Sequence, residues 1–336
     1  MAKQLLGREV TAIMNEKIKG NVTTLKRNGI MPTLGIIRVG ENDADLSYER
    51  SITKKCESLS VACEKFLLPQ DVTEEELLNV INQINKDDNI HGVLLFRPLP
   101  KHLKEEKIVN AIAFTKDVDG ISDASLAGVF AGKEQGFPPC TAQACMEILD
   151  YYGIDCAGKN AVVVGRSLVV GKPVAMMLIQ KNATVTICHT RTRSLPDVVR
   201  EADIVIAAAG KAGIIDSSCL QEGQIIIDVG INVDAEGKLC GDVNYGEAEG
   251  IVDSITPVPG GVGSVTTSVL VGHVVEAALR KLKKYSHDNY GGGKNEFCRE
   301  FKDNQKKEEY HPGAAGRYFG RVEAGSFQMG VRRWLS

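Results

Sequence analysis

A glycine-rich segment in the middle of the chain, VVVGRSLVVGKP (162–173), has the composition of a phosphate-binding turn. A run of valines ends at Gly165, the turn contains Ser167 and Gly171, and Pro173 suits the first turn of a helix. Such a strand–turn–helix unit presents backbone N–H groups and a helix N-terminus to a phosphate. Because the spacing departs from the strict G-x-G-x-x-G pattern, an ordinary glycine-rich turn is the alternative.

The end of the next expected strand indicates which dinucleotide would bind. An acidic residue there usually holds the ribose hydroxyls of NAD, whereas a basic residue accommodates the 2′-phosphate of NADP. Here the strand ends in CHTRTR (188–193), without a carboxylate. Arg166 and Arg191 could face a 2′-phosphate, with Thr190 as a hydroxyl donor, so NADP is favoured over NAD. The alternative is that both arginines belong to an ordinary solvated surface.

Two further segments could contact a flat ligand. In KDVDG (116–120), the Asp119 carboxylate could accept two parallel N–H bonds from an amino-pyrimidine ring, although an Asx-turn is the alternative. In ITPVPGGVGSVT (255–266), Gly260, Gly261 and Gly263 permit close approach of the backbone to a ligand. Many loops of this composition are simple turns.

Strands and helices alternate around these motifs. In the first third we expect a helical stripe between Val10 and Leu25, a helix over 46–58, a helix opened by the capping box of Thr73 and Glu76, and strands at 33–40, 61–68 and 91–98. After residue 139 the alternation restarts, with strands at 161–165, 184–189, 203–210 and 224–230 and a long helix over 266–284. Continuously apolar strands between helices predict an α/β fold with largely parallel sheets, divided into two domains.

Composition excludes several classes of protein. The 336 residues include 40 Lys and Arg against 43 Asp and Glu, and this balance argues against a nucleic-acid partner. The chain begins without a signal-peptide core, and we expect no apolar stretch near the roughly 18 residues of a membrane span. Nine cysteines without a C-x-x-C pair are typical of reduced thiols, so we expect a cytoplasmic protein without a metal site.

In this order, the motifs resemble the methylenetetrahydrofolate dehydrogenase/methenyltetrahydrofolate cyclohydrolase family. The matching segments are VGEND followed by Tyr48, PLP (98–100), KDVDG, PCT (139–141), GRS-x-x-VGKP, IIDVGIN and PVPGGVG (257–263). The resemblance covers about residues 3–284. It implies a catalytic domain of residues 1–140 plus 264–284 and a Rossmann NAD(P)-binding domain of residues 141–263. Folate would lie in the cleft between them, and the Rossmann domains would form a homodimer.

The resemblance also assigns roles to residues, all without a metal. Tyr48 would stack on the tetrahydrofolate ring system and Asp119 would anchor the pterin, as the catalytic pair. Further substrate contacts would come from Pro98, Leu99, Pro100, Gly260 and Gly261. The cofactor would contact Gly165, Arg166, Ser167, Gly171, Thr190, Arg191, Ile231 and Gly263. The implied reaction is hydride transfer from the methylene carbon to nicotinamide, a step of one-carbon metabolism that serves purine biosynthesis.

Two positions depart from the family. A lysine usually follows the tyrosine by four residues, on the same helical face, and here that position is Ile52. A glutamine usually stands two residues before PLP, and here it is Phe96, followed by Arg97. Neither replacement can transfer the protons that the hydrolytic step needs, so the interpretation is a dehydrogenase whose cyclohydrolase step is in question.

Three alternatives stay open. The first is a bifunctional enzyme in which Arg97 or Lys55 replaces the missing lysine. The second is a non-catalytic folate- or nucleotide-binding module, which would be favoured had Tyr48, Asp119 or the glycine turn been lost. The third is a two-domain dehydrogenase for a small hydroxy acid, which would leave KDVDG and PVPGGVG unexplained. Residues 285–336 have eight glycines and few branched aliphatic residues, so we expect a disordered, dispensable tail.

Overall fold

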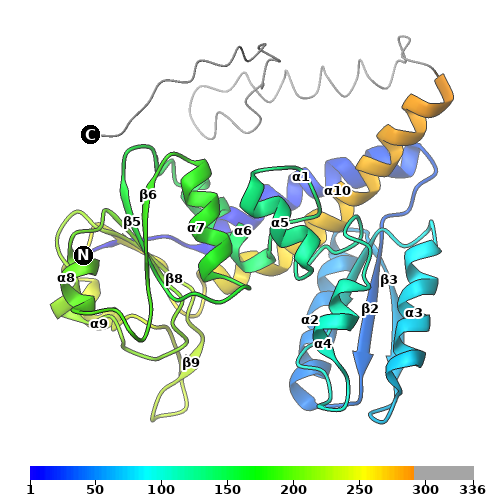
Figure 1. Ribbon diagram of the computed structural model, residues 1–336. Coiled ribbons are helices and arrows are strands. Elements are labelled where there is room, and N and C mark those ends of the chain that lie inside the picture. Colours follow the sequence, from blue (N-terminus) through cyan, green and yellow to red (C-terminus); the bar gives the residue numbers. More distant parts are fainter. Residues whose placement is uncertain (291–336) are drawn as a thin grey trace, which may run out of the picture. The chain divides into compact units, whose positions relative to one another are not determined.

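The computed structural model describes residues 1–290, in which two parallel sheets are surrounded by helices (Figure 1). The strands are β1 (Lys3–Gln4), β2 (Thr33–Val39), β3 (Ala62–Leu68), β4 (Gly92–Leu95), β5 (Asn160–Val164), β6 (Thr184–Cys188), β7 (Ile204–Ala207), β8 (Ile225–Asp228), β9 (Asn232–Val233), β10 (Leu239–Cys240) and β11 (Ser254–Ile255). The helices are α1 (Gly7–Arg27), α2 (Asp43–Ser58), α3 (Glu74–Lys86), α4 (Glu105–Asn110), α5 (Asp123–Ala131), α6 (Cys140–Tyr151), α7 (Gly171–Gln180), α8 (Leu195–Arg200), α9 (Tyr245–Ala248) and α10 (Val262–Tyr290), with a 3₁₀ turn η1 (Ser217–Cys219).

The first sheet has the strand order β3-β2-β4, and all its pairings are parallel. Helix α3 presents Leu77, Ile81 and Ile84 to an apolar cluster that includes residues of β2 and β4. Helices α2 and α10 contact this sheet as well, and Figure 1 shows α2 and α3 flanking β2 and β3. The capping box is confirmed, since Thr73 and Glu76 each accept the other's backbone N–H, at 3.2 and 2.9 Å.

The second sheet has the order β1-β11-β8-β7-β5-β6, and its recorded pairings are parallel. Strand β5 lies next to the edge strand β6, with β7 on its other side. The chain therefore goes from β5 to one neighbour and then crosses back to the opposite side. In a parallel α/β sheet, ligands bind beyond the carboxyl ends of the strands at such a reversal.

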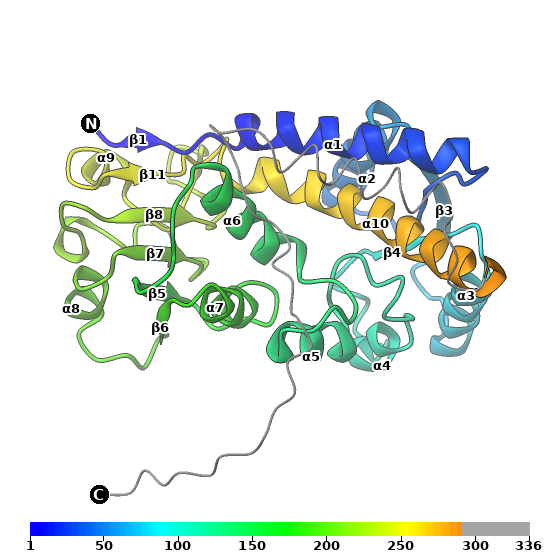
Figure 2. The same ribbon diagram turned by 90° about the horizontal axis from the view of Figure 1, so that it is seen from above.

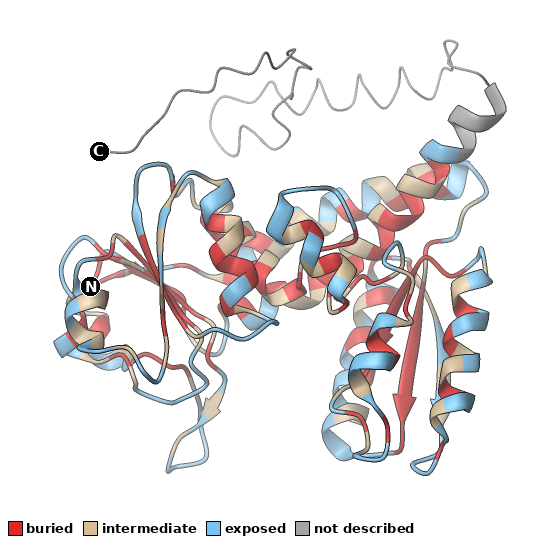
Figure 3. Cartoon of the chain, in the orientation of Figure 1, coloured by how far each residue is buried: buried red, intermediate tan, exposed pale blue. Residues whose placement is uncertain are grey.

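Helix α10 packs along α1 and also contacts α6 (Figure 2). Its segment Val262–Lys284 has a mean hydropathy of 1.4 over an 18-residue window, so the expectation that no stretch approaches a membrane span is wrong on composition. The helix is apolar because it packs inside the protein, where 61% of that window is buried. Figure 3 shows buried residues in red on the part of this helix that lies among the other helices.

Two ends of the described chain differ from expectation. Strand β1, from within the expected first domain, pairs with β11 of the second sheet. Helix α10 continues to Tyr290, so the expected disordered tail does not begin at residue 285, and the remainder of that tail lies outside the described residues. The other domain boundaries stay predictions.

Candidate functional site

The turn after β5 lies at the chain reversal of the second sheet. Gly165 has φ +136°, and a Cβ atom there would lie 2.1 Å from the carbonyl oxygen of Ala208, which follows β7. A Cβ atom on Gly171 would lie 2.2 Å from the carbonyl oxygen of Gly165. The turn therefore needs glycine at both positions, and helix α7 begins at Gly171 itself, two residues before Pro173.

The hydroxyl of Ser167 closes the same turn. Its Oγ accepts the backbone N–H of Val170 at 3.1 Å and that of Gly171 at 3.5 Å. The Lys172 N–H donates to the carbonyl oxygen of the same serine at 3.0 Å, so Ser167 holds the first turn of α7 through both its side chain and its backbone. This arrangement suits an anionic group, because a helix N-terminus carries partial positive charge.

The segment after β6 lies beside this turn, since β5 and β6 are paired through Val164 and Cys188. Its backbone is fixed locally: His189 N–H donates to Thr192 Oγ1 at 2.8 Å, and Arg191 N–H donates to His189 Nδ1 at 3.1 Å. Arg166, Thr190 and Arg191 are exposed. The structure thus places both arginines on strand ends that are neighbours in the sheet.

The PVPGGVG loop connects β11 to α10. Gly260 has φ +107°, and its carbonyl oxygen accepts the N–H of Gly7 at 2.9 Å. A Cβ atom on Gly261 would lie 2.6 Å from the carbonyl oxygen of Pro257, and one on Gly263 would lie 3.8 Å from Ile231 Cδ1. The structure therefore brings Ile231, which is 68% exposed, next to the glycine loop.

Tyr48, one of the expected substrate residues, lies beside the segment that follows the last strand of the first sheet. Tyr48 on α2 is 41% exposed, and its ring centroid lies 5.5 Å from that of Phe96, just beyond β4. Phe96 is 6% exposed and Ile52, one turn along α2 from Tyr48, is fully buried. Both positions that depart from the family are therefore apolar and buried beside Tyr48.

The two aspartates of KDVDG differ in their surroundings. Asp117 is fully buried and accepts hydrogen bonds from Ser122 N at 2.8 Å, Ser122 Oγ at 2.6 Å and Ser125 Oγ at 2.7 Å. It thereby holds the start of α5. Asp119 lies close to Tyr48 and Cys140, and burial raises its pKa to about 6 against the opposing effect of the Arg97 charge. Burial and the Asp119 charge in turn raise the pKa of Tyr48.

Two residues that the sequence interpretation did not assign to the site support the KDVDG turn from behind. The thiol of Cys140 donates to the Val118 carbonyl oxygen at 3.2 Å, and His273 of α10 donates to the same oxygen from Nδ1 at 2.8 Å. Burial lowers the pKa of His273 to about 4, so the ring is neutral. The PCT motif is a signal for Cys140, whereas His273 lies on the buried side of a helix without any motif.

The two candidate replacements for the missing lysine lie in different places. Arg97 forms an ion pair with Glu105 at 3.5 Å, and Glu105 also accepts the N–H of Leu99 at 3.1 Å, which anchors the PLP segment. The peptide bond between Arg97 and Pro98 is cis. Burial and the nearby Lys19 of α1 lower the pKa of Lys55. Of the two, Arg97 is the residue whose charge lowers the pKa of Asp119.

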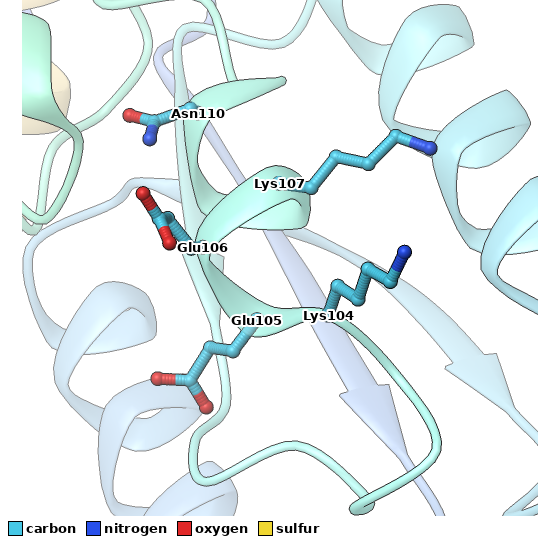
Figure 4. A pocket seen from close by; sticks show the side chains of 5 residues that line it. All are labelled: Lys104, Glu105, Glu106, Lys107 and Asn110. Atoms are coloured by element: carbon cyan, nitrogen blue, oxygen red, sulfur yellow. The ribbon is translucent and has the colours of Figure 1, made fainter.

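A surface pocket of about 490 Å³ lies at α4, and Glu105, the ion-pair partner of Arg97, is one of its lining residues (Figure 4). It is lined by Lys104, Glu105, Glu106, Lys107 and Asn110. Lys107 is paired with Glu74 at 2.6 Å. None of its lining residues is among the expected site residues, so this pocket is not part of the candidate site.

Comparison with known proteins agrees with this arrangement. A family model for the tetrahydrofolate dehydrogenase/cyclohydrolase catalytic domain matches residues 5–119, and one for the NAD(P)-binding domain of the same family matches residues 139–282. The chain belongs to the tetrahydrofolate dehydrogenase/cyclohydrolase family. The resemblance expected from the motifs, and the two-domain α/β fold with its parallel sheets, are confirmed.

Several members of the tetrahydrofolate dehydrogenase/cyclohydrolase family are similar over most of their length. The bifunctional protein FolD of Carboxydothermus hydrogenoformans is 53% identical over 279 residues, which are 82% of this chain and 97% of that protein. The crystal structure of the FolD enzyme of Campylobacter jejuni has a TM-score of 0.82 at 39% identity, covering 84% of this chain and all of that chain. The Trypanosoma brucei FolD structure, complexed with NADP cofactor and inhibitor, has a TM-score of 0.78 at 32% identity, with 84% and 98% coverage.

Proposed function

We propose that this protein oxidises 5,10-methylenetetrahydrofolate to 5,10-methenyltetrahydrofolate with NADP and that it has lost most of the cyclohydrolase step. The observation that supports loss of the cyclohydrolase step is the Tyr48–Phe96 contact, with Ile52 fully buried one helical turn away. The dehydrogenase step is supported by the family and by Tyr48, Asp119 and the glycine turn, all of which are retained.

The substrate side of this mechanism uses two side chains. Tyr48 offers a half-exposed ring on which the folate ring system would stack. Asp119 would accept paired N–H bonds from the pterin and would thereby fix the orientation of the ring system. Loss of hydride leaves a cation shared with the adjacent substrate nitrogens. Orientation is therefore the main requirement, and no general base is needed for this step.

The cofactor side fits NADP on two observations. Gly165 and Gly171 bring the backbone into a cradle that a Cβ atom would fill, and helix α7 begins at that cradle with Gly171. Arg166 and Arg191 are exposed at the neighbouring strand ends, where charge would meet a 2′-phosphate. When bound, NADP supplies the nicotinamide carbon that accepts the hydride.

The hydrolytic step makes different demands. Water must be activated and protons must be moved at the bridge, and such acid–base groups typically contribute about 10²–10⁴-fold. Isoleucine and phenylalanine have no titratable atom. A second candidate, the fully bifunctional enzyme that also makes 10-formyltetrahydrofolate, would rely on Arg97, which directly follows Phe96 and pairs with Glu105 at 3.5 Å.

One experiment separates these candidates. The purified protein is mixed with methylenetetrahydrofolate and either NADP or NAD, and the methenyl and formyl products are followed together. We expect methenyl product to accumulate with NADP and to be hydrolysed little faster than in buffer. Formyl product in step with cofactor reduction would support the bifunctional enzyme, and absence of any oxidation would support a binding module.

We also propose a homodimer through the NAD(P)-binding domain. The antiparallel pair β9–β10 exposes Val233 at 65% and Leu239 at 51%, which is apolar surface that a partner could cover. Light scattering after size-exclusion chromatography tests this, with Val233→Asp expected to give monomers.

A further inference from the structure

Two buried aspartates lie at the carboxyl edge of the second sheet, outside the residues that the family resemblance assigns. Asp228 ends β8 and is 3% exposed, and Asp242 follows β10 and is fully buried. Among the described residues, neither is recorded in an ion pair. Buried carboxylates of this kind must be satisfied by hydrogen bonds, and here the donors are almost all backbone N–H groups.

Asp228 holds the loops on either side of β9–β10. Its Oδ1 accepts the N–H of Gly230 and of Asp242, and its Oδ2 accepts the N–H of Val243, each at 3.0 Å. A Cβ atom on Gly241 would lie 1.9 Å from Asp228 Oδ2. The backbone after β10 is therefore pressed directly against this carboxylate.

Asp242 holds the loop after β7. Its carboxylate accepts the N–H groups of Ala209 at 2.6 Å, Gly210 at 2.9 Å and Lys211 at 2.8 Å. Asn232 Nδ2 donates to the same carboxylate at 2.9 Å. Because Asp242 N–H itself donates to Asp228, the two side chains form one linked unit, which we call the aspartate clamp.

The clamp is continuous with the cofactor turn and with Ile231. Ala208, whose carbonyl oxygen lies against Gly165, immediately precedes the residues that Asp242 binds. Ile231 stands between Gly230, held by Asp228, and Asn232, held by Asp242. Its backbone is thus fixed on both sides while its side chain stays 68% exposed.

We propose that Asp228 and Asp242 are positioning residues for the dinucleotide, which hold the 209–211 backbone and the exposed Ile231 side chain against the nicotinamide half of the cofactor. The inference rests on the proposed NADP binding. An amide at position 242 would keep the size of the side chain but would turn one acceptor into a donor that faces backbone N–H groups. The loop after β7 would then lose its anchor.

The test is calorimetric titration of NADP and NADPH into the full-length protein and its Asp242→Asn variant, followed by steady-state kinetics. We expect Asp242→Asn to raise the Kd of the dinucleotide by about tenfold or more, the scale of one unpaired buried donor. The KM for the folate substrate should stay within about twofold, because the clamp does not contact the residues around Tyr48.

Asp203→Asn is the matched control. Asp203 accepts the N–H of Asn160 at 2.8 Å at the amino end of the same sheet, away from the proposed cofactor edge. It should leave the dinucleotide Kd unchanged. Equal weakening in both variants, or wild-type affinity in Asp242→Asn, would overturn the proposal.

If Asp242→Asn does not fold, Asn232→Ala decides the question, because it removes a single donor to the clamp. The same selective rise in dinucleotide Kd is then required, and its absence refutes the proposal. Wild-type protein that binds no NADP would instead contradict the proposed function.

Discussion

The ring of Phe96 lies 5.5 Å from the ring of Tyr48 at an angle of 70°, so that the edge of one ring meets the face of the other. Such a pair stabilises the fold by about 0.5–1.5 kcal/mol beyond the burial of its area. It also fixes the tyrosine from behind with an apolar group. Together with the buried Ile52, it lines this wall of the site with apolar side chains at the two positions that depart from the family.

Restoring the polar pair should restore hydrolysis. We expect Ile52→Lys with Phe96→Gln to raise the rate of methenyl hydrolysis by about 10²-fold or more, within the range of acid–base catalysis. Ile52→Lys alone should gain less, because its amine would lie beside Phe96 without an amide to orient it. Hydrolysis of purified methenyltetrahydrofolate measures this without the oxidative step. If the unmodified protein already hydrolyses it efficiently, the idea fails, and Arg97→Ala and Lys55→Ala become the informative variants.

The pKa of Asp119 predicts a pH dependence. Burial raises this pKa from 3.8 to about 6 in the folded protein. Below pH 6 the carboxylate that would accept the pterin N–H groups is therefore mostly protonated. We expect kcat/KM for the folate substrate to fall as the pH drops through 6. Asp119→Asn should have a low kcat/KM without this inflection, and an unchanged inflection would assign it to another group.

The same shift affects stability in the opposite sense. Because the folded pKa lies above the unfolded value, the contribution of Asp119 is complete below pH 3.8 and is lost as the pH rises through 6. At pH 7 the buried charge therefore lowers the free energy of unfolding, and Asp119→Asn should be more stable than wild type at this pH. Denaturant unfolding at pH 4 and pH 7 measures the difference, and an equal stability change at both values would contradict the assignment.

Arg191 should discriminate between the two dinucleotides. We expect Arg191→Ala to weaken NADP binding by about 1–3 kcal/mol, the size of a charge-assisted hydrogen bond, and to leave NAD binding nearly unchanged. Direct titration of each cofactor checks this. Lys159→Ala removes a positive charge at the amino end of β5, near Asp203 at 3.7 Å, and serves as the control for general electrostatics. Equal loss for both cofactors would show that the arginine does not read the phosphate.

Gly165 should be intolerant of substitution. Its φ of +136° and the 2.1 Å approach of a Cβ atom to the Ala208 carbonyl oxygen mean that Gly165→Ala requires the strand ends to separate. We expect a loss of more than about 1–3 kcal/mol, the cost of backbone strain alone, together with loss of cofactor binding. Gly158→Ala is the matched control, since Gly158 also has positive φ, at +72°, but has no atom within 4 Å of a Cβ. Similar losses in the two variants would contradict the role of the Ala208 contact.

Much of this arrangement follows from local patterns. Apolar strands, helical stripes and the Thr73–Glu76 capping box predict most elements of both sheets, because each depends on residues close in sequence. Helix α10 is the expected long helix, but it begins at Val262, within the glycine loop, and not at residue 266. Family motifs identify Tyr48 and Asp119 in the same way.

The remainder depends on contacts between distant segments. Nothing in KDVDG itself distinguishes Asp117, whose carboxylate accepts hydrogen bonds from Ser122 and Ser125, from Asp119, the proposed pterin anchor. The aspartate clamp likewise joins loops that follow different strands, and His273 supports the site from a helix more than a hundred residues away. Such roles are visible only when the chain is folded.

Strand β1 has a consequence for the order of assembly during biosynthesis. Lys3 and Gln4 pair with Ser254 and Ile255, which leave the ribosome only after both sheets are otherwise synthesised. Contacts between segments so far apart form slowly, because a long loop must close before they gain any stabilisation. Until then the edge of β11 is open, and an open strand edge can pair with another chain. The short pairing of β1 thus covers the exposed edge of β11 last, and conditions that delay this pairing should favour aggregation of newly made protein.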